Sequence, residues 1–369
     1  MDILCFTDSL VSGGAQRQLV NLAILLKREG HNIRFLVYRD IPFYKHYLDE
    51  EGIALEVIKC NNYLKRIAKI GKYLRHYNGD IVISFLETPN FLSCLAAAGK
   101  HRWKLITNEL SAKDSSFVGI RNKIFKWFER YSDWTVCNSK NAEKMWIEHY
   151  PQYRNRISTI YNPILLLNVN RNNEKVGSIG KRNVLIAASY QYLKNPVRVI
   201  EAVSQLDDSY KQCLHIDWYG RKEPSKGEVE AAIEAEGLIK KYHLEETISL
   251  HEETKDIYQQ MQLSDAVGLF SELEGLPNAI LEGMALRKPI LMSKVSDYEI
   301  LVTTNGFLCD PFDVSSIREC FKNFLDCSDA ELKKMGDESY EKAIRMFSPN
   351  VIISQWNNLF IKLVSIDKV

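Results

Sequence analysis

The sequence predicts an α/β protein built from two Rossmann-like domains in tandem. Short apolar runs alternate with longer amphipathic runs, which is the pattern of βαβ units and parallel sheets. This alternation restarts once, near residue 183, after a polar segment at 168–182. The length of 369 residues is too great for one ordinary doubly wound domain and suits two.

In the first half, the runs assign strands and helices in turn. The helix at 15–27 carries Ala15, Leu19, Leu22 and Leu26 on one face, and Gly30 ends it. Strands are expected at 3–7, 33–38, 55–58, 80–85, 104–108, 134–138 and 157–161, and further helices at 65–76, 89–98 and 120–131.

The second half repeats the pattern and ends in helices. Strands are expected at 184–188, 213–219, 247–250, 266–270 and 289–292, and helices at 195–205, 228–242, 255–262, 277–286, 314–325, 330–346 and 351–363. The predicted parts of the chain are therefore an N-terminal domain at 1–163, a C-terminal domain at 164–347 and a terminal segment at 348–369.

Composition indicates a cytoplasmic globular protein. Hydrophobic residues make up 46% of the chain, but no run approaches the ~20 apolar residues of a membrane-spanning helix. The first residues, with acidic Asp2 and a short apolar run, do not resemble a signal peptide. The eight cysteines and eight histidines are dispersed without C-x-x-C or H-E-x-x-H spacing, so we expect buried free thiols and no protein-bound metal or other cofactor.

Charge is unevenly distributed. Residues 1–163 hold 24 Lys and Arg against 16 Asp and Glu, and the remainder holds 24 against 31. A basic half favours an anionic partner, namely a phospholipid surface, a phosphorylated lipid acceptor or nucleic acid, although surface charge also drifts without function. The helix at 120–131 is basic and aromatic, which suits an anionic membrane surface, unless its aromatic residues simply face the core.

The segment 271–285 carries the clearest chemistry. It joins a strand to a helix, which in an open parallel sheet is the edge where ligands bind. Glu274 in the loop and Glu282, about one and a half turns into the helix, could each accept two hydrogen bonds from a vicinal diol. The alternative is a pair of surface glutamates beside a helix cap.

The run E-G-L-P-N-A-x-L-E-G-M-A-x-x-x-P-I, beginning at Glu274, resembles the E-x7-E segment of the family-four retaining glycosyltransferases of GT-B fold. The loop 12–17, the segments 131–139 and 194–196, and the run 200–202 also resemble that family, in the same order. The resemblance implies two Rossmann-like domains with a cleft between them, and a C-terminal helix that crosses back to the first domain. It also implies an acceptor bound by the first domain, and a nucleotide-diphosphate-sugar bound by the second.

The resemblance also implies residue roles. Glu274 would hold the transferred sugar, Glu282 the ribose, and Lys194 the diphosphate. The resemblance also implies that Gly13 and Gly14 approach the donor phosphates. The alternatives are an ordinary turn at the two glycines and a solvated lysine at position 194. The donor-binding residues that it implies are Gly13, Gly14, Ser189, Lys194, Asn195, Arg221, Glu274, Gly275, Leu276, Pro277, Asn278 and Glu282. Ala188 and Ser189 stand where the family usually has an arginine five residues before the lysine, so Arg221 or Arg17 would supply the second cation. Glu109, which ends a strand of the first domain, is the candidate acceptor contact or base.

These expectations converge on a retaining, metal-independent hexosyltransferase. It would move a hexose or N-acetylhexosamine to a lipid-linked glycan acceptor in capsule or lipopolysaccharide assembly, beside the inner face of the cytoplasmic membrane and without a nucleic-acid partner. Two alternatives stay open: a nucleotide-sugar epimerase and a non-catalytic sugar- or partner-binding module of the same fold. A dinucleotide-dependent oxidoreductase is disfavoured, because residues 12–17 do not supply G-x-G-x-x-G.

Overall fold

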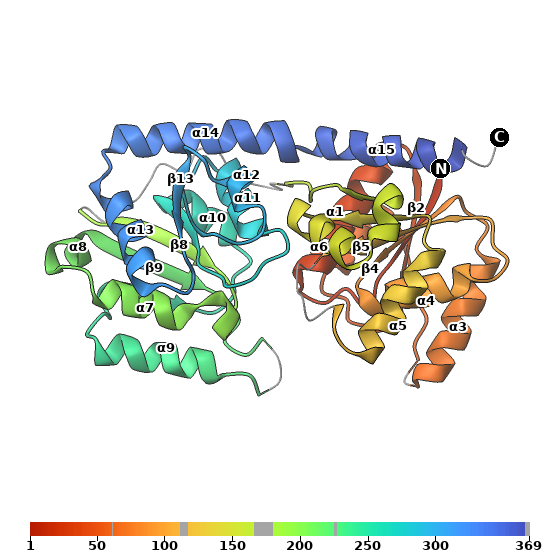
Figure 1. The fold of residues 1–369 in the computed structure, drawn as a ribbon, viewed down its shortest axis with the longest axis horizontal. Helices are drawn as coiled ribbons and strands as arrows, with labels where there is room; N and C mark the ends of the chain where they lie inside the picture. The colour runs from red at the N-terminus through yellow and green to blue at the C-terminus, as the bar shows by residue number, and fades with distance from the viewer. Residues whose placement is uncertain (61, 111–116, 166–179, 225–226, 366–369) are drawn as a thin grey trace. The chain divides into compact units, whose positions relative to one another are not determined.

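The computed structural model describes residues 1–60, 62–110, 117–165, 180–224 and 227–365. The chain forms two units: unit 1 comprises Met1–Leu165 and Phe347–Val369, and unit 2 comprises Leu166–Met346. Each unit contains a parallel sheet that is covered by helices (Figure 1). The predicted α/β class with two Rossmann-like sheets is therefore confirmed.

Unit 1 has a seven-stranded sheet in the order β3-β2-β1-β4-β5-β6-β7. Its strands are β1 (Asp2–Phe6), β2 (Asn32–Val37), β3 (Ala54–Val57), β4 (Ile81–Phe85), β5 (Lys104–Glu109), β6 (Trp134–Cys137) and β7 (Ile157–Thr159). Its helices are α1 (Gly14–Arg28), α2 (Lys45–Glu50), α3 (Tyr63–His76), α4 (Glu87–Ala97), α5 (Ile120–Phe128), α6 (Lys140–His149) and α15 (Pro349–Ser365), with 3-10 turns η2 (Glu129–Tyr131) and η3 (Pro151–Arg156). The central strands β1 and β4 are apolar and almost wholly buried, as parallel strands covered on both faces must be.

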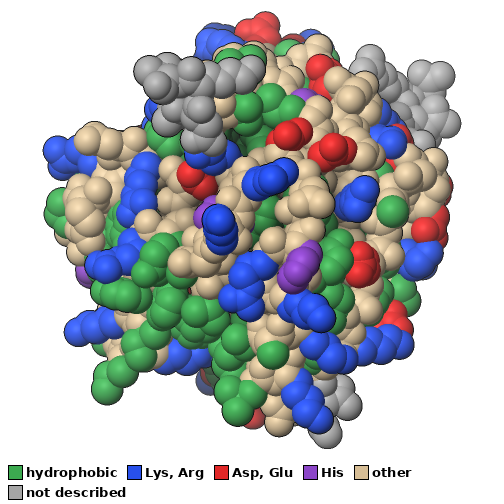
Figure 2. All heavy atoms as spheres, turned by 90° about the vertical axis from the view of Figure 1, so that its right-hand side faces the viewer, with side chains coloured by type: hydrophobic (Ala, Val, Ile, Leu, Met, Phe, Trp, Pro, Cys, Tyr) green, Lys and Arg blue, Asp and Glu red, His purple; other side chains and the backbone are tan. Residues whose placement is uncertain are grey.

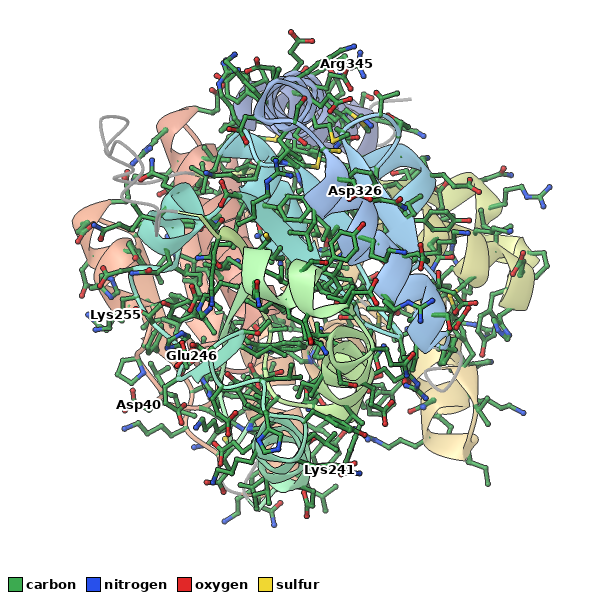
Figure 3. The ribbon with its side chains drawn as sticks, turned by 90° about the vertical axis from the view of Figure 1, so that its left-hand side faces the viewer. Asp40, Lys241, Glu246, Lys255, Asp326 and Arg345 are labelled. Atoms are coloured by element: carbon green, nitrogen blue, oxygen red, sulfur yellow. The ribbon has the colours of Figure 1, made fainter. Side chains whose placement is uncertain are left out.

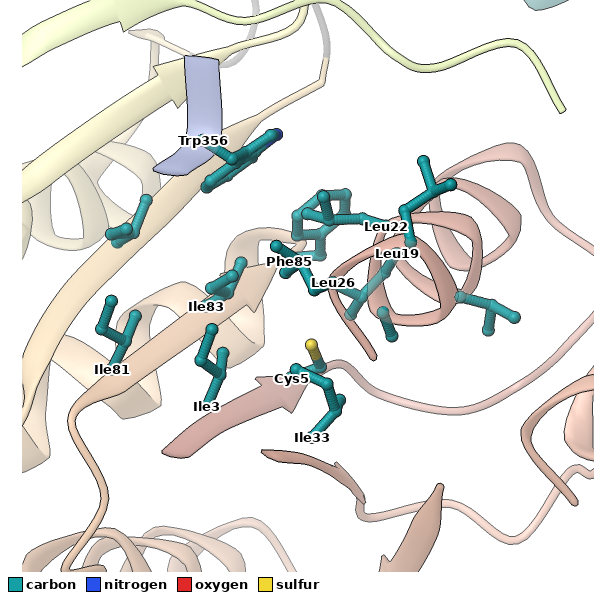
Figure 4. Packing of buried hydrophobic residues seen from close by; sticks show 14 of the residues in the cluster. Ile3, Cys5, Leu19, Leu22, Leu26, Ile33, Ile81, Ile83, Phe85 and Trp356 are labelled. Carbon is teal, nitrogen blue, oxygen red and sulfur yellow. The ribbon is translucent and has the colours of Figure 1, made fainter. Parts of the chain in front are cut away.

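Alternate residues of these strands feed two cores. Ile3 and Cys5 of β1 face α1 and α15, together with Ile81 and Ile83 of β4 (Figure 4). Leu4 belongs to the second core, which buries the apolar residues of α3 and α4. Successive residues of a strand therefore point to opposite faces of the sheet. Because α5 packs against α4, it lies on the same face as the second core.

Helix α15 belongs to unit 1 although it ends the chain. Its residues Trp356 and Phe360 are 3% and 0% exposed, within the core formed with α1. The backbone amide of Ile164 donates to the carbonyl of Phe347 at 3.0 Å, so the segments at residues 164 and 347 run side by side. The helix begins at Pro349, where a missing amide hydrogen carries no cost. No helix within the described ranges is both long and apolar enough to cross a membrane.

Unit 2 has a six-stranded sheet in the order β10-β9-β8-β11-β12-β13. Its strands are β8 (Arg182–Ala187), β9 (Leu214–Tyr219), β10 (Ile248–His251), β11 (Ala266–Leu269), β12 (Ile290–Ser293) and β13 (Gly306–Cys309). Its helices are α7 (Pro196–Ser204), α8 (Asp208–Cys213), α9 (Glu230–Lys241), α10 (Ile257–Leu263), α11 (Asn278–Ala285), α12 (Tyr298–Leu301), α13 (Val314–Asp326) and α14 (Asp329–Phe347), with a 3-10 turn η4 (Tyr192–Lys194).

The helices of unit 2 are divided between the sheet faces by the same alternation. Ala266 lies in the core that holds α7, α9 and α13, whereas the next residue, Val267, contacts α11 on the other face. Figure 3 shows the ends of three of these helices, with Lys241 closing α9, Asp326 closing α13 and Arg345 in the last turn of α14.

A polar cluster lies on strands β8, β9 and β10 of this sheet. Asp217 on β9 accepts hydrogen bonds from His251 (2.7 Å) and Asn183 (2.8 Å), and it pairs with His215. Burial alone would raise the pKa of Asp217, but hydrogen bonds from His215, His251 and Asn183 outweigh burial and lower it to about 2.

The structure adds elements that the periodicity did not predict, namely α2, α6, α8, α12 and β13. In α6 only Ala142 and Trp146 are buried, so the sequence has too few apolar positions to show a helical period. Strand β13 has four residues and begins at Gly306, a composition typical of a loop. All eight cysteines are free, and six of them are buried, as expected.

Candidate active site

Strand order reverses once in each sheet, and these reversals position the candidate site segments. In unit 2, β8 pairs with β9 on one side and with β11 on the other. Lys194 follows β8 and Glu274 follows β11, so the topology alone brings their loops to the same edge of the sheet. In open α/β sheets this reversal is where ligands bind, beyond the carboxyl ends of the strands.

Lys194 and Glu274 form an ion pair at this edge. The Nζ of Lys194 lies 2.6 Å from Oε1 of Glu274, and the two side chains are 19% and 13% exposed. The hydroxyl of Ser271 donates to the same carboxylate oxygen at 2.7 Å. A backbone hydrogen bond from Glu272 to the carbonyl of Leu193 holds the two loops together at 2.8 Å. The two residues that the motifs single out are therefore neighbours in space, although 80 residues separate them.

Helix α11 begins beside this pair. Pro277 is its N-cap, in an extended conformation, so the helix starts one residue later than predicted. The amide of Ile280 donates to the carbonyl of Pro277 at 3.0 Å, so the amides that precede it are the ones that favour anions and hydroxyl oxygens. Ser296 donates to the carbonyl of Gly275 and fixes the loop that precedes the helix. Leu276 is buried, and Asn278 is half-buried at the helix start.

Glu282 lies in the middle of α11 with a largely buried side chain, 8% exposed. The hydroxyl of Tyr258, from α10, donates to Glu282 Oε1 at 3.3 Å. The next residue, Gly283, faces β11 so closely that a Cβ atom there would lie 2.8 Å from Cβ of Val267. The small residue after Glu282 therefore lets α11 pack tightly against the sheet, which sets the depth of both glutamates.

Arg221 follows β9 but is held by another residue. Its Nη2 lies 3.0 Å from Oε1 of Glu253, and both side chains are partly exposed. The backbone at Gly220, the preceding residue, approaches the carbonyl oxygen of Ala188 so closely that a Cβ atom there would lie 1.9 Å from it. Position 220 therefore requires glycine. The role of Arg221 as a second phosphate-binding cation stays a prediction, and Arg221 would have to leave Glu253 to fulfil it.

Asn195 and Ser189 are predicted donor contacts with local partners. Asn195 is 1% exposed, and its amide donates to the carbonyls of Phe270 (3.1 Å) and Pro311 (2.7 Å). Its φ of +69° also allows the sharp entry into α7. The hydroxyl of Ser189 donates to the side chain of Gln191. These contacts let Asn195 position the neighbouring Lys194, and direct contact with the donor stays a prediction.

Sequence reasoning missed two side chains at this edge. Arg198 of α7 forms an ion pair with Glu272 and is a cation close to Lys194 in the chain. Tyr258 contacts Glu282 from another element. Arg198 is near Lys194 in the chain, but Asn195 separates Lys194 from α7, so helical spacing does not relate the two cations. Nothing in the sequence pairs Tyr258 with Glu282.

Unit 1 carries the remaining predicted residues. Gly13 is the N-cap of α1, with φ −144° and ψ 149°, and Gly14 is the exposed first residue of that helix. This backbone is extended, so the absence of a side chain, rather than a left-handed turn, is what Gly13 contributes. A Cβ atom there would lie 2.4 Å from Oε1 of Gln16, whose flexible side chain would have to move.

Glu109 ends β5 in a buried ion pair. Its Oε2 accepts from Nζ of Lys126 at 2.5 Å and from the indole nitrogen of Trp146 at 3.0 Å. Burial alone would lower the pKa of Lys126, but the carboxylates of Glu109 and Glu129 outweigh burial and raise it. The ion pair therefore connects α5 and α6 to the sheet, and a catalytic role for Glu109 stays a prediction.

Solved structures with the same fold include a glycosyltransferase from Rickettsia africae, which superposes with a TM-score of 0.81 at 19% identity over 98% of each chain. The Anabaena protein HepE in complex with UDP and glucose superposes with a TM-score of 0.82 at 18% identity, over 98% of this chain and 100% of that chain. The chain therefore has the GT-B fold, with two Rossmann-like parallel sheets.

The chain belongs to the family-four glycosyltransferases. The family model described as Glycosyltransferase Family 4 matches residues 12–166, and the model described as Glycosyl transferases group 1 matches residues 169–342. Among named relatives, a Campylobacter jejuni alpha-1,4-N-acetyl-D-galactosaminyltransferase, whose name places its acceptor on PP-undecaprenol, is 25% identical over 304 residues, 77% of each chain. An uncharacterised Haemophilus influenzae glycosyltransferase is 24% identical over 94% of this chain and 96% of its own length.

Proposed function

We propose that this chain transfers a hexose or N-acetylhexosamine from a nucleoside diphosphate sugar to a lipid-linked glycan acceptor, with retention of anomeric configuration and without a bound metal. The observation that carries the proposal is the contact between Lys194 and Glu274 at the strand-order reversal of unit 2. A cation, a carboxylate and a helix N-terminus converge there, which are the groups needed to hold a sugar and to neutralise a departing diphosphate.

The ion pair between Lys194 and Glu274 would have to separate when the donor binds. In the structure Lys194 and Glu274 neutralise each other. Donor binding would turn Glu274 towards the sugar hydroxyls and leave the charge of Lys194 to the diphosphate. The amides of residues 275–278 would face the sugar and phosphates, Glu282 would accept the ribose hydroxyls, and Gly13 and Gly14 would contact the phosphates.

The proposed reaction exchanges one bond at the anomeric carbon and moves one proton. The bond between the anomeric carbon and the diphosphate oxygen breaks, and Lys194 stabilises the charge that develops on that oxygen. The acceptor hydroxyl bonds to the anomeric carbon on the face that the diphosphate leaves, and its proton passes to the departing phosphate. Among the described residues, no group of three or more His, Cys, Asp or Glu is arranged to hold a metal ion.

A membrane-bound acceptor is supported by the surface of unit 1 and by the names of relatives. Helix α3 contains five Lys and Arg residues and no acidic residue. Lys and Arg side chains are also more frequent than Asp and Glu over the lower half of the face in Figure 2. Such a surface attracts anionic lipids, so we place the enzyme at the inner face of the cytoplasmic membrane, in lipopolysaccharide, capsule or related polysaccharide assembly.

The test is hydrolysis of a panel of nucleotide-sugars without acceptor, comparing the wild type with Glu274→Ala and with the exposed control Glu341→Ala. The proposal expects slow release of one nucleoside diphosphate that Glu274→Ala abolishes and Glu341→Ala preserves. Equal turnover by all three proteins would refute the role of Glu274. Tight binding of a nucleotide-sugar without hydrolysis or transfer to any lipid-linked acceptor would instead establish a binding module.

A further inference from the structure

Unit 1 contains an open cavity of about 440 Å³ between α5 and the α6–η3 segment. Four aromatic rings line it, together with Lys123, Arg130, His149 and Gln152, and no carboxylate belongs to the lining. The volume is sufficient for a phosphate or diphosphate group with an attached sugar. The lining therefore combines positive charge with flat apolar surfaces and favours an anionic ligand that also has an apolar part.

The two permanent cations of the cavity are available to a ligand. Lys123 and Arg130 are both exposed, and no carboxylate among the described residues pairs with either of them. The guanidinium of Arg130 lies 4.0 Å from the ring centroid of Trp127, which holds it in place. Lys123 lies on α5 and Arg130 on the η2 turn that follows it, and both line the cavity beside Trp127. An arginine placed in this way can donate two parallel hydrogen bonds to a phosphate.

Side-chain contacts hold the floor of the cavity. Tyr153 is buried, and its hydroxyl donates to the carbonyl of Lys126 at 3.3 Å. Lys126 is in turn fixed by its ion pair with Glu109. Phe117, which precedes α5, stacks on His149 at the end of α6, with a ring separation of 4.3 Å and an interplanar angle of 7°. These contacts order the aromatic lining before any ligand arrives, which lowers the entropy cost of binding.

An exposed apolar ridge adjoins the cavity. Ile120, Ile124 and Trp127 of α5 are 80%, 47% and 46% exposed, and they follow one another along the same side of the helix. Trp127 belongs both to this ridge and to the cavity lining. Arg121 lies on the far side of the ridge from Lys123, so apolar residues run between basic ones. This order is typical of a helix that lies in a membrane interface.

We propose that the cavity binds the phosphate or diphosphate of a lipid-linked acceptor, with the first part of its hydrocarbon chain along the ridge. Lys123 and Arg130 would contact the phosphate oxygens, and the rings would contact the adjoining sugar. This inference rests on the proposed function for its acceptor class, and it assigns that acceptor a site outside the donor-binding edge of unit 2. The same phosphate chemistry occurs in free diphosphate and in anionic phospholipids, and the experiment separates these sources.

The experiment measures binding of three probes: farnesyl diphosphate, inorganic diphosphate, and phosphatidylcholine vesicles with or without phosphatidylglycerol. The cavity variant is Lys123→Ala/Arg130→Ala. Its control, Lys69→Ala/Lys72→Ala, removes the same charge from exposed positions of α3. A ridge variant, Ile120→Ser/Ile124→Ser, tests the apolar contact. All substituted side chains are exposed, so thermal unfolding should change little and serves to verify folding.

We expect farnesyl diphosphate to bind more tightly than inorganic diphosphate. The cavity variant should weaken both, by about tenfold for each cation removed, and the ridge variant should weaken only farnesyl diphosphate. The α3 control should keep farnesyl diphosphate affinity within about twofold and lose affinity only for vesicles with phosphatidylglycerol. Equal losses in the cavity variant and the α3 control, or no binding of farnesyl diphosphate, would overturn the inference.

Donor turnover distinguishes failure of this inference from failure of the proposed function. Glu274-dependent hydrolysis of a nucleotide-sugar without farnesyl diphosphate binding would leave the transferase proposal standing and remove the cavity from it. Cavity-dependent binding without any donor turnover would retain the cavity as a lipid phosphate site and remove the proposed transfer.

Discussion

Replacing Lys194 by methionine separates its structural role from its proposed chemical role. The substitution keeps the unbranched shape and most of the length of the side chain, and it removes the charge that lies 2.6 Å from Glu274. If Lys194 stabilises the departing diphosphate, its loss should lower the turnover number by about 10²–10³-fold, the usual effect of removing one well-placed donor to a developing charge. The same change leaves a carboxylate that is only 13% exposed without its cation, so unit 2 should lose about 1–2 kcal/mol of stability.

The measurements are steady-state transfer kinetics and thermal unfolding. For a unit of this size, the loss of stability corresponds to a fall of about 2–8 °C in Tm. The double variant Lys194→Met/Glu274→Gln removes the unpaired charge, so we expect its Tm to return towards that of the wild type while turnover stays low. Lys255→Met, at an exposed lysine of the same unit (Figure 3), is the control for both measurements. A single variant with reduced Tm but turnover within threefold of the wild type would refute the chemical role.

Three further substitutions test packing and charge. Gly283→Ala should lower stability by about 1–3 kcal/mol and weaken donor binding, because α11 must move away from β11. Its control, Gly237→Ala, at an open helical position, should add about 0.5–1 kcal/mol of stability. Chemical denaturation measures both. Asp217→Asn should remove about 2 kcal/mol of stability above pH ~4, because the pKa of Asp217 is lowered in the folded state. In a denaturation series, the difference in stability between wild type and variant should vanish as pH falls from about 4 to about 2. Trp356→Ala should destabilise unit 1 by about 3–5 kcal/mol in urea unfolding, and a comparable loss from Ile361→Ala, at an exposed position of the same helix, would contradict this account.

The alternation of apolar runs was sufficient to predict both sheets and most of their helices, since buried parallel strands and amphipathic helices leave clear periods in a sequence. The strand-to-helix junction at 271–285 also placed Glu274 and Glu282 correctly on a loop and a helix. Elements with few buried residues, such as α6, leave no such period. Their existence follows from caps and tertiary contacts, for example the hydrogen bond from the amide of Ala142 to Ser139 Oγ.

Pairs between distant segments were the least predictable part of the site. Lys126 resembles the other basic residues of the helix at 120–131, yet it is 5% exposed because it meets Glu109. On that helix, Phe125 packs against Phe91 at 4.3 Å, whereas Ile124 is 47% exposed. The sequence shows which residues are basic or apolar, but the choice between core and surface depends on which neighbour the fold supplies.

The return of α15 to unit 1 has a consequence for biosynthesis on the ribosome. Unit 1 begins at the first residue, but its core includes Trp356 and Phe360 near the last. Every residue of unit 2, up to Met346, therefore leaves the ribosome before unit 1 can close its core. Domains generally fold in the order of synthesis. Here the second unit can fold first, because the apolar face of α1 stays exposed until α15 has been synthesised.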